Sequence, residues 1–127
     1  MNFECKQLKI IDDPDFGCTI EFNDTVEVYR ENMTIEELIN SVGKYLMIQR
    51  SYPEDEFEND WYHIETSEAD IDFNQKDSMY VKLNRKEFEF YCSGVTLVIG
   101  LTLSDKEYTK LDKILRTRFK DKVVMRG

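Results

Sequence analysis

Apolar and polar residues alternate along much of this chain, as they do in strands that bury one face of a sheet. Residues 95–103 show the pattern most clearly. Turn-forming residues interrupt it at 12–15 and 74–77. The alternation therefore predicts a succession of short strands, at 3–10, 18–22, 26–28, 61–66, 69–73, 79–83, 88–92 and 95–103.

A strand is also expected at residues 44–51, but this segment is almost entirely apolar. A strand without alternation is usually buried on both of its faces. We therefore expect residues 46–48 near the centre of the sheet, partly shielded by a helix.

Two segments carry the start signal of a helix. Thr34 and Glu37 have the spacing of a capping box, in which each side chain bonds the backbone of the other, and they predict a helix over 34–42. Ser104 and Glu107 predict a second helix over 105–119 in the same way. The apolar stripe of this second helix consists of Tyr108, Leu111, Ile114, Leu115 and Phe119.

These elements together predict an α+β fold. Runs of strands closed by a terminal helix favour an antiparallel sheet, here of about six to eight strands, with the C-terminal helix packed on one face. The 127 residues fit one domain that spans 1–127. Residues 121–127 are expected to fray or to add an edge strand at 123–125.

The charge of the chain, −9 overall, is unevenly distributed. Residues 1–80 hold 20 acidic and 6 basic residues, whereas residues 81–127 hold 6 acidic and 11 basic ones. An acidic surface repels nucleic acid and membranes and attracts basic proteins. We therefore expect a protein partner, with no nucleic acid and no membrane.

The segment from residue 52 to residue 62 combines carboxylates with large aromatic side chains. Carboxylates steer a cationic partner during encounter, and aromatic side chains offer large contact areas. For Trp61 and for the single histidine, His63, both a core and an interface position stay open. The residues predicted to bind a partner are Tyr52, Glu54, Asp55, Glu56, Phe57, Glu58, Asp60, Trp61 and Tyr62.

The chain carries no common catalytic motif: no phosphate-binding glycine loop and no nucleophile elbow. The acidic clusters lack the spacing of a calcium loop. A hydrolase that uses Asp70, Asp72 and His63 is a weaker hypothesis, which needs these three side chains to converge. We expect a protein that is not an enzyme, with no catalytic residue, no cofactor and no metal.

The three cysteines, Cys5, Cys18 and Cys92, show no CxxC spacing and lie among apolar residues. This pattern predicts buried, reduced thiols. The N-terminus lacks a basic segment followed by an apolar core, and residues 95–103 are too short to span a membrane. The expected location is therefore the cytoplasm.

The segment YLMIQR at 45–50, followed by WYHIE at 61–65, resembles the immunity protein 10 family of bacterial toxin systems. The capped helix that begins with SDKE at 104–107 extends this resemblance, so that it covers about residues 45–119. The resemblance implies a protective protein that binds a toxin without catalysis.

From these observations we predict an immunity protein that binds and occludes a cognate toxin domain, a basic one such as a nuclease. It would act as a monomer or a homodimer. The alternative is a small-ligand-binding or regulatory α+β module, whose apolar pocket would be lined by Trp61, Phe88 and Phe90.

Overall fold

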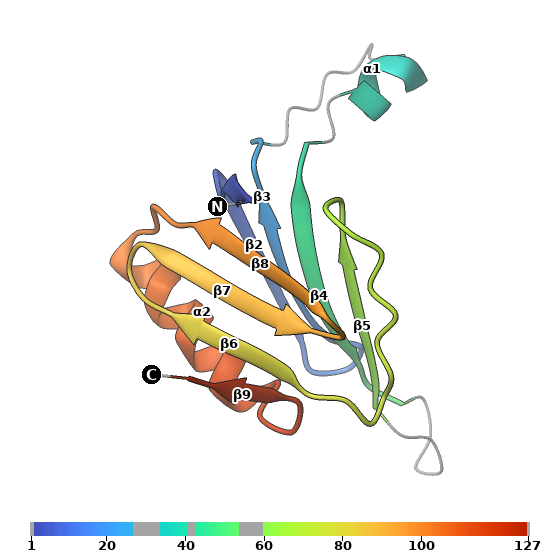
Figure 1. The fold of residues 1–127 in the computed structure, drawn as a ribbon, viewed down its shortest axis with the longest axis vertical. Helices are drawn as coiled ribbons and strands as arrows, with labels where there is room; N and C mark the ends of the chain where they lie inside the picture. The colour runs from blue at the N-terminus through green and yellow to red at the C-terminus, as the bar shows by residue number, and fades with distance from the viewer. Residues whose placement is uncertain (1, 27–33, 41–42, 54–59, 127) are drawn as a thin grey trace.

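A computed structural model describes residues 2–26, 34–40, 43–53 and 60–126, which form two β-sheets and two helices (Figure 1). One sheet has five strands in the order β1-β8-β7-β6-β9, and the other has four in the order β2-β3-β4-β5. The first comprises β1 (Phe3–Glu4), β6 (Met79–Leu83), β7 (Glu87–Cys92), β8 (Val95–Gly100) and β9 (Val123–Met125). The second comprises β2 (Gln7–Asp13), β3 (Gly17–Asn23), β4 (Tyr45–Ser51) and β5 (Trp61–Thr66).

The α+β class is confirmed in its coarse form, but the single sheet is a wrong prediction. Helix α2 (Asp105–Thr117) has 13 residues and is therefore about 20 Å long. Strands lie about 4.8 Å apart, so a helix of this length cannot cover the apolar face of nine strands. The strands therefore form two sheets, and the four-stranded sheet covers the part of the apolar face of the five-stranded sheet that α2 leaves open. The five-stranded sheet is also not purely antiparallel, because its edge strands β1 and β9 pair in parallel with β8 and β6, whereas every pair of the four-stranded sheet is antiparallel.

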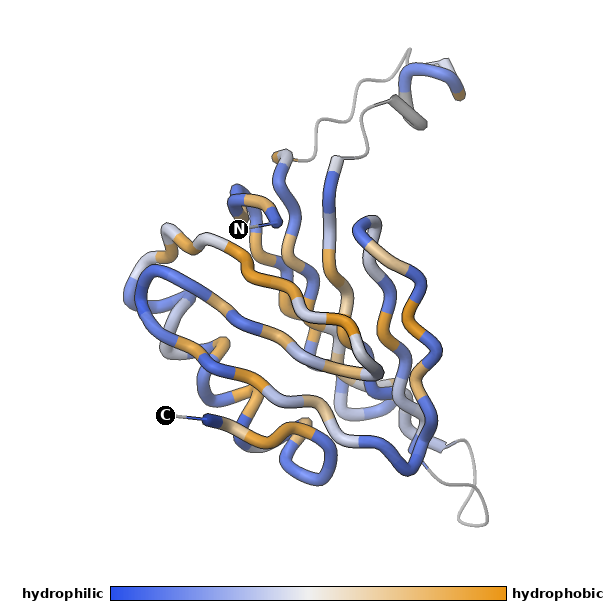
Figure 2. Tube along the Cα trace, viewed as in Figure 1, coloured by the Kyte–Doolittle hydropathy of each residue, from blue (hydrophilic) through white to orange (hydrophobic). Residues whose placement is uncertain are grey.

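The core lies between the inner faces of the two sheets and α2. Phe22 of β3 and Phe88 of β7 stack across it with ring centroids 4.5 Å apart. Helix α2 adds Leu111, Ile114 and Leu115, all buried. Apolar and polar positions alternate along the strands of both sheets, as Figure 2 shows, so each sheet turns its polar residues outward.

Strand β4 corrects the expectation that residues 46–48 are buried on both faces. The strand lies centrally, between β3 and β5. Leu46 and Ile48 are fully buried, but Tyr45, Met47 and Gln49 are half-buried on the outer face. No helix shields this outer face among the described residues, since α2 packs inside.

The strand expected at 69–73 is also absent from the part of the chain that the structure describes. Residues 67–78 run beside β5 without forming a strand, and Ile71 and Phe73 pack partly buried against the core (Figure 1). Val26 is not in a strand either, and residues 27–33 lie outside the described ranges. The edge strand expected at 123–125 is confirmed as β9.

Both helix starts are confirmed. Ser104 and Glu107 form the expected capping box of α2, with hydrogen bonds of 3.1 and 3.2 Å. Thr34 accepts a hydrogen bond from the backbone of Glu37 at 3.1 Å, at the start of α1 (Ile35–Asn40). Helix α1 lies apart from the sheets, and Ile35 is 78% exposed (Figure 1).

Candidate functional site

Two acidic segments that are distant in the sequence meet at one end of the four-stranded sheet. Gly17 pairs with both Asp13 and Ser51, and Ser51 pairs with Trp61. The backbone N–H of Tyr52 donates to the carbonyl of Phe16 at 3.0 Å. We call this region the acidic end and define it by Asp13, Asp15, Phe16, Tyr52 and Trp61.

A glycine permits this close approach of the β2–β3 turn to β4. Gly17 has φ of +148°, a conformation that side chains disfavour. A Cβ atom at this position would lie 2.1 Å from the carbonyl oxygen of Arg50. The carboxylate of Asp13 shapes the same turn, because it accepts from the backbone N–H groups of Asp15 at 2.8 Å and Phe16 at 3.3 Å.

Two of the three aromatic side chains of the acidic end are unusually exposed. Phe16 is 77% exposed and Trp61 is 60% exposed. Ile11, which is also 60% exposed, and the exposed His63 lie in the next row of the same outer face, since Ile11 pairs with Thr19 and Gln49 pairs with His63. Solvent-exposed apolar side chains that gather in one place mark surfaces that contact other molecules.

The guanidinium of Arg50 organises the inner side of this end. Its Nε donates to Asp60 at 2.6 Å, and a second nitrogen pairs with the same carboxylate. It also lies 5.0 Å from the ring centre of Tyr52 and 5.9 Å from that of Tyr62. A third contact, 2.5 Å long, runs to the backbone carbonyl of Arg118. Arg50 thereby connects β4 to the start of β5 and to the end of α2.

A second arginine ties β2 to the same end of α2. The Nε of Arg118 lies 3.0 and 3.2 Å from the two carboxylate oxygens of Asp12. Asp12 and Asp60 are therefore neutralised by internal partners. Asp13 and Asp15 are the carboxylates of the acidic end that form no ion pair with a described residue.

The residues predicted to bind a partner, Tyr62 aside, fall into three groups. Tyr52 and Trp61 belong to the acidic end, with Tyr52 half-buried under Arg50. Asp60 is engaged in the ion pair with Arg50, so its charge is largely neutralised locally. The remaining acids and the phenylalanine of the segment, Glu54, Asp55, Glu56, Phe57 and Glu58, lie outside the described residues.

Tyr62 does not fit the expected contact role. Its side chain is only 5% exposed and packs near Phe119, with ring centres 6.4 Å apart. The side chain of Gln75 bonds both the N–H and the carbonyl of Tyr62, at 2.9 and 2.8 Å. Successive side chains of a strand point to opposite faces, so an outward Trp61 places Tyr62 inward.

Sequence reasoning did not select Asp13, Asp15 and Phe16. Residues 12–15 were interpreted as a turn whose carboxylates lack the spacing of a calcium loop, and Phe16 falls outside the alternating runs. A large apolar residue placed directly after a turn, with no alternating partner, was the available signal for Phe16. No signal in the sequence indicated that this turn lies against Tyr52.

The structure assembles none of the alternative chemical sites among its described residues. Asp70 and Asp72 are exposed in a segment without strand pairing, and no group of His, Cys, Asp and Glu side chains in the described ranges has the arrangement of a metal site. Phe88 and Phe90 are fully buried in the core, whereas Trp61 lies on an outer face, so these three do not line one pocket.

All three cysteines are free and buried, as predicted. Burial raises the pKa of the Cys18 thiol to about 11 and also raises the pKa of Cys5 and of Cys92. A raised pKa keeps a thiol protonated and weakly nucleophilic. The thiols are thus structural parts of the core.

No helix in the described ranges has the length and apolar character required to cross a membrane. Comparisons with protein-family models, with curated proteins and with solved structures found no match to this chain.

Proposed function

We propose that this chain is an immunity protein, which neutralises a basic toxin domain by binding it and covering its active site. The proposal rests on the resemblance of residues 45–119 to the immunity protein 10 family and on the surface that the sheet register creates. The acidic end is the proposed docking surface.

One observation carries the choice of this surface. The turn at 12–16 lies against Tyr52, and the pairing of Gly17 with Ser51 and of Ser51 with Trp61 puts Trp61 in the same row, although about 40 residues separate the turn from these positions in the chain. Their junction presents Phe16 and Trp61 to solvent beside the carboxylates of Asp13 and Asp15. Exposed aromatic side chains act as anchors that slow dissociation, and carboxylates accelerate the encounter with a basic partner.

The internal ion pairs support the same role. The largely covered Arg50 and the more exposed Arg118 tie β4 and β2 to the end of α2, so the outward residues are held in place before a partner arrives. Preorganisation of this kind reduces the entropy lost on binding. We also propose that the protein acts in the cytoplasm, where buried free thiols stay reduced.

The test uses the protein encoded by the reading frame adjacent to this chain's gene. Co-expression of the two proteins should rescue growth of cells that the neighbour alone kills. The purified pair should associate more slowly as salt rises, because salt screens steering by exposed charges. Growth arrest that continues despite equal expression of both proteins would sink the proposal.

A charge-reversal variant tests whether the acidic residues between Tyr52 and Trp61 in the sequence steer the partner. The triple change Glu54→Lys, Asp55→Lys, Glu56→Lys should lower the association rate at least tenfold at low salt and leave the dissociation rate nearly unchanged. The matched control is Glu4→Lys, Glu36→Lys, Glu37→Lys, which changes the net charge equally at exposed positions of β1 and α1. Equal losses in both triple variants would point to total charge and not to this surface.

A further inference from the structure

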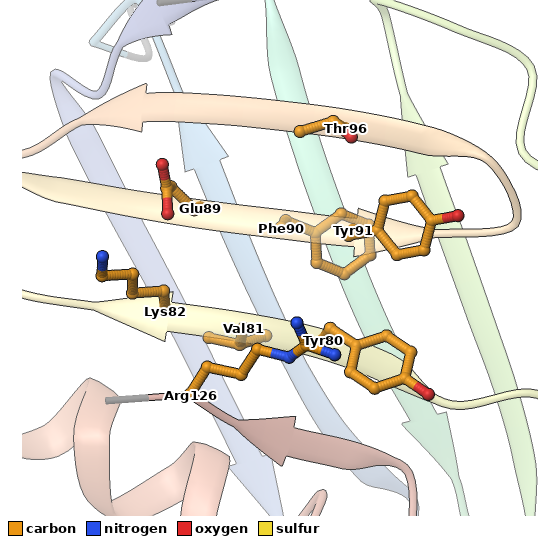
Figure 3. A pocket seen from close by; sticks show the side chains of 8 residues that line it. All are labelled: Tyr80, Val81, Lys82, Glu89, Phe90, Tyr91, Thr96 and Arg126. Carbon is orange, nitrogen blue, oxygen red and sulfur yellow. The ribbon is translucent and has the colours of Figure 1, made fainter.

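The outer face of the five-stranded sheet carries a second surface, unrelated to the acidic end. It holds a shallow depression of about 700 Å³ (Figure 3). Tyr80, Tyr91 and Thr96 form one row across β6, β7 and β8, since Tyr80 pairs with Tyr91 and Tyr91 pairs with Thr96. The rings of Tyr80 and Tyr91 lie 6.1 Å apart. The buried Val81 and Phe90 lie beneath them.

Arg126 lies at the side of this depression. Its guanidinium is 4.7 Å from the ring centre of Tyr80, and its backbone N–H donates to the carbonyl of Val81 at 2.7 Å. No carboxylate of a described residue pairs with this guanidinium. Arg126 therefore offers an uncompensated, planar cation that is already oriented by the tyrosine.

Arg85 provides an internal comparison. It also lies over a tyrosine, Tyr108, at 4.2 Å from the ring centre. Its guanidinium, however, is bonded to Asp105 at 2.6 Å. At Arg85, as at Arg50, an arginine that lies over a tyrosine has its charge paired with a carboxylate, whereas at Arg126 the charge is left for a ligand.

Lys82 and Glu89 complete the lining in the next row, where they pair directly across β6 and β7. With Arg126 they give the depression a formal charge of +1, in a chain whose net charge is −9. The two cations suit an anionic group, and the carboxylate of Glu89 can accept a hydrogen bond from an N–H or O–H group beside it.

We propose that this depression binds a nucleoside phosphate. The base stacks on Tyr91, which is 46% exposed, and the phosphate pairs with Arg126 and Lys82. Glu89 accepts from a base amine or a ribose hydroxyl. The depression has a volume within the range of small-molecule sites, about 300–1,000 Å³. The overall charge of −9 favours a free nucleotide over a long nucleic acid, in line with the expectation of no nucleic-acid partner.

The experiment is an NMR titration of the whole chain with AMP, with inorganic phosphate, and with a six-nucleotide single-stranded RNA. AMP should shift the ring signals of Tyr80 and Tyr91, with Kd of about 0.1–1 mM because the site is open on one side. Phosphate alone should bind at least tenfold more weakly, since it lacks the stacking base.

Four variants test which side chains bind AMP. Tyr91→Ala and Arg126→Gln should each weaken AMP binding about tenfold or more, whereas Tyr91→Phe should retain it. Arg85→Gln is the matched control, because it removes an arginine from a similar tyrosine stack outside the depression. It should leave the Kd for AMP unchanged.

Three results would each overturn the proposal. The first is an absence of ring shifts in the wild-type protein at 10 mM AMP, about ten times the upper expected Kd. The second is an equal loss of affinity for AMP in Arg85→Gln and Arg126→Gln. The third is binding of the RNA at least tenfold tighter than AMP per nucleotide, which would assign the surface to nucleic acid. The wild-type titration decides the proposal even if a variant fails to fold.

Discussion

The outer faces of the two sheets differ although their inner faces are alike. Both sheets direct apolar side chains inward, and Phe22 and Phe88 meet at their junction. Outside, the acidic end combines the exposed Phe16 and Trp61 with the carboxylates of Asp13 and Asp15, whereas the five-stranded sheet sets Tyr80 beside an arginine. Inner positions therefore specify how the sheets pack, and outer positions specify which molecules they can meet.

This contrast also separates two uses of arginine. Arg50 and Arg118 neutralise carboxylates inside the acidic end and hold elements together. Arg126 pairs with no carboxylate of a described residue, and it lines the depression on the five-stranded sheet. Charge that is compensated internally contributes to stability, and charge that is left uncompensated is available for binding.

The largest loss of stability is expected from a substitution on the inner face of strand β7, compared with one on its outer face. Phe88→Ala removes a ring that is buried in the core, and it should lower the free energy of unfolding by about 3–5 kcal/mol. Tyr91→Ala, on the outer face of the same strand β7, should cost less than about 1 kcal/mol. Urea unfolding of both variants measures the difference. Similar losses of stability in the two variants would show that the outward side chains of β7 also contribute to the free energy of unfolding.

The next largest loss of stability is expected from an arginine whose ion pair is largely covered, compared with one whose ion pair is exposed. Arg50→Ala leaves Asp60 without its partner in a site where the arginine side chain is 20% exposed, and it should cost about 2–3 kcal/mol. Arg85→Ala breaks an exposed pair with Asp105 and should cost about 1 kcal/mol or less. Thermal or urea unfolding of the two variants checks this order. A larger loss for Arg85→Ala would contradict the central position given to Arg50.

The sequence predicted individual elements well because each depends on local chemistry. The capping box of Ser104 and Glu107 bonds residues three positions apart, so it is visible in the sequence and forms as expected. The alternation in β3 and β8 likewise needs no partner strand to be recognised. The order of strands was not predictable in this way, because nearly all inner faces are equally apolar and any two would pack.

The candidate site was only partly predictable for the same reason. In WYHIET, the set Trp61, His63 and Glu65 is more polar than the set Tyr62, Ile64 and Thr66, a difference that favours an inward Tyr62, but the sequence prediction left the buried face open and assigned Tyr62 to partner contact. The contact between Phe16 and Tyr52 depends on the pairing of β3 with β4, which local patterns do not specify. Asp60 was selected for its charge, which the sequence could not show to be paired with Arg50.

An alkaline pH series tests the inner face of β3. Burial raises the pKa of Cys18 from 9.0 to about 11. Between these pH values the unfolded chain loses the thiol proton while the folded chain keeps it, so stability falls as pH rises. The loss should reach about 2 kcal/mol by pH 11.

The control for this series is Cys18→Ala, which removes the titrating group. This variant should be less stable than the wild type at pH 8, and the difference between their free energies of unfolding should become smaller toward pH 11. Urea unfolding at one-unit pH intervals measures both curves. Curves that stay parallel from pH 8 to pH 11 would mean that Cys18 ionises as easily in the folded chain as in the unfolded one.

The smallest effect on stability is expected at the acidic end itself. Trp61→Ala removes a side chain that is 60% exposed, so the free energy of unfolding should change by about 0.5 kcal/mol or less. Val124→Ala, at an exposed apolar residue of the five-stranded sheet, should be equally neutral. The two variants should differ in binding: if Trp61 anchors the proposed toxin, only Trp61→Ala should accelerate dissociation, by about tenfold or more. Surface-immobilised neighbour protein and stopped-flow dissociation measure this rate. A normal dissociation rate in Trp61→Ala, together with a full growth rescue, would move the docking surface away from the acidic end while leaving the immunity function intact.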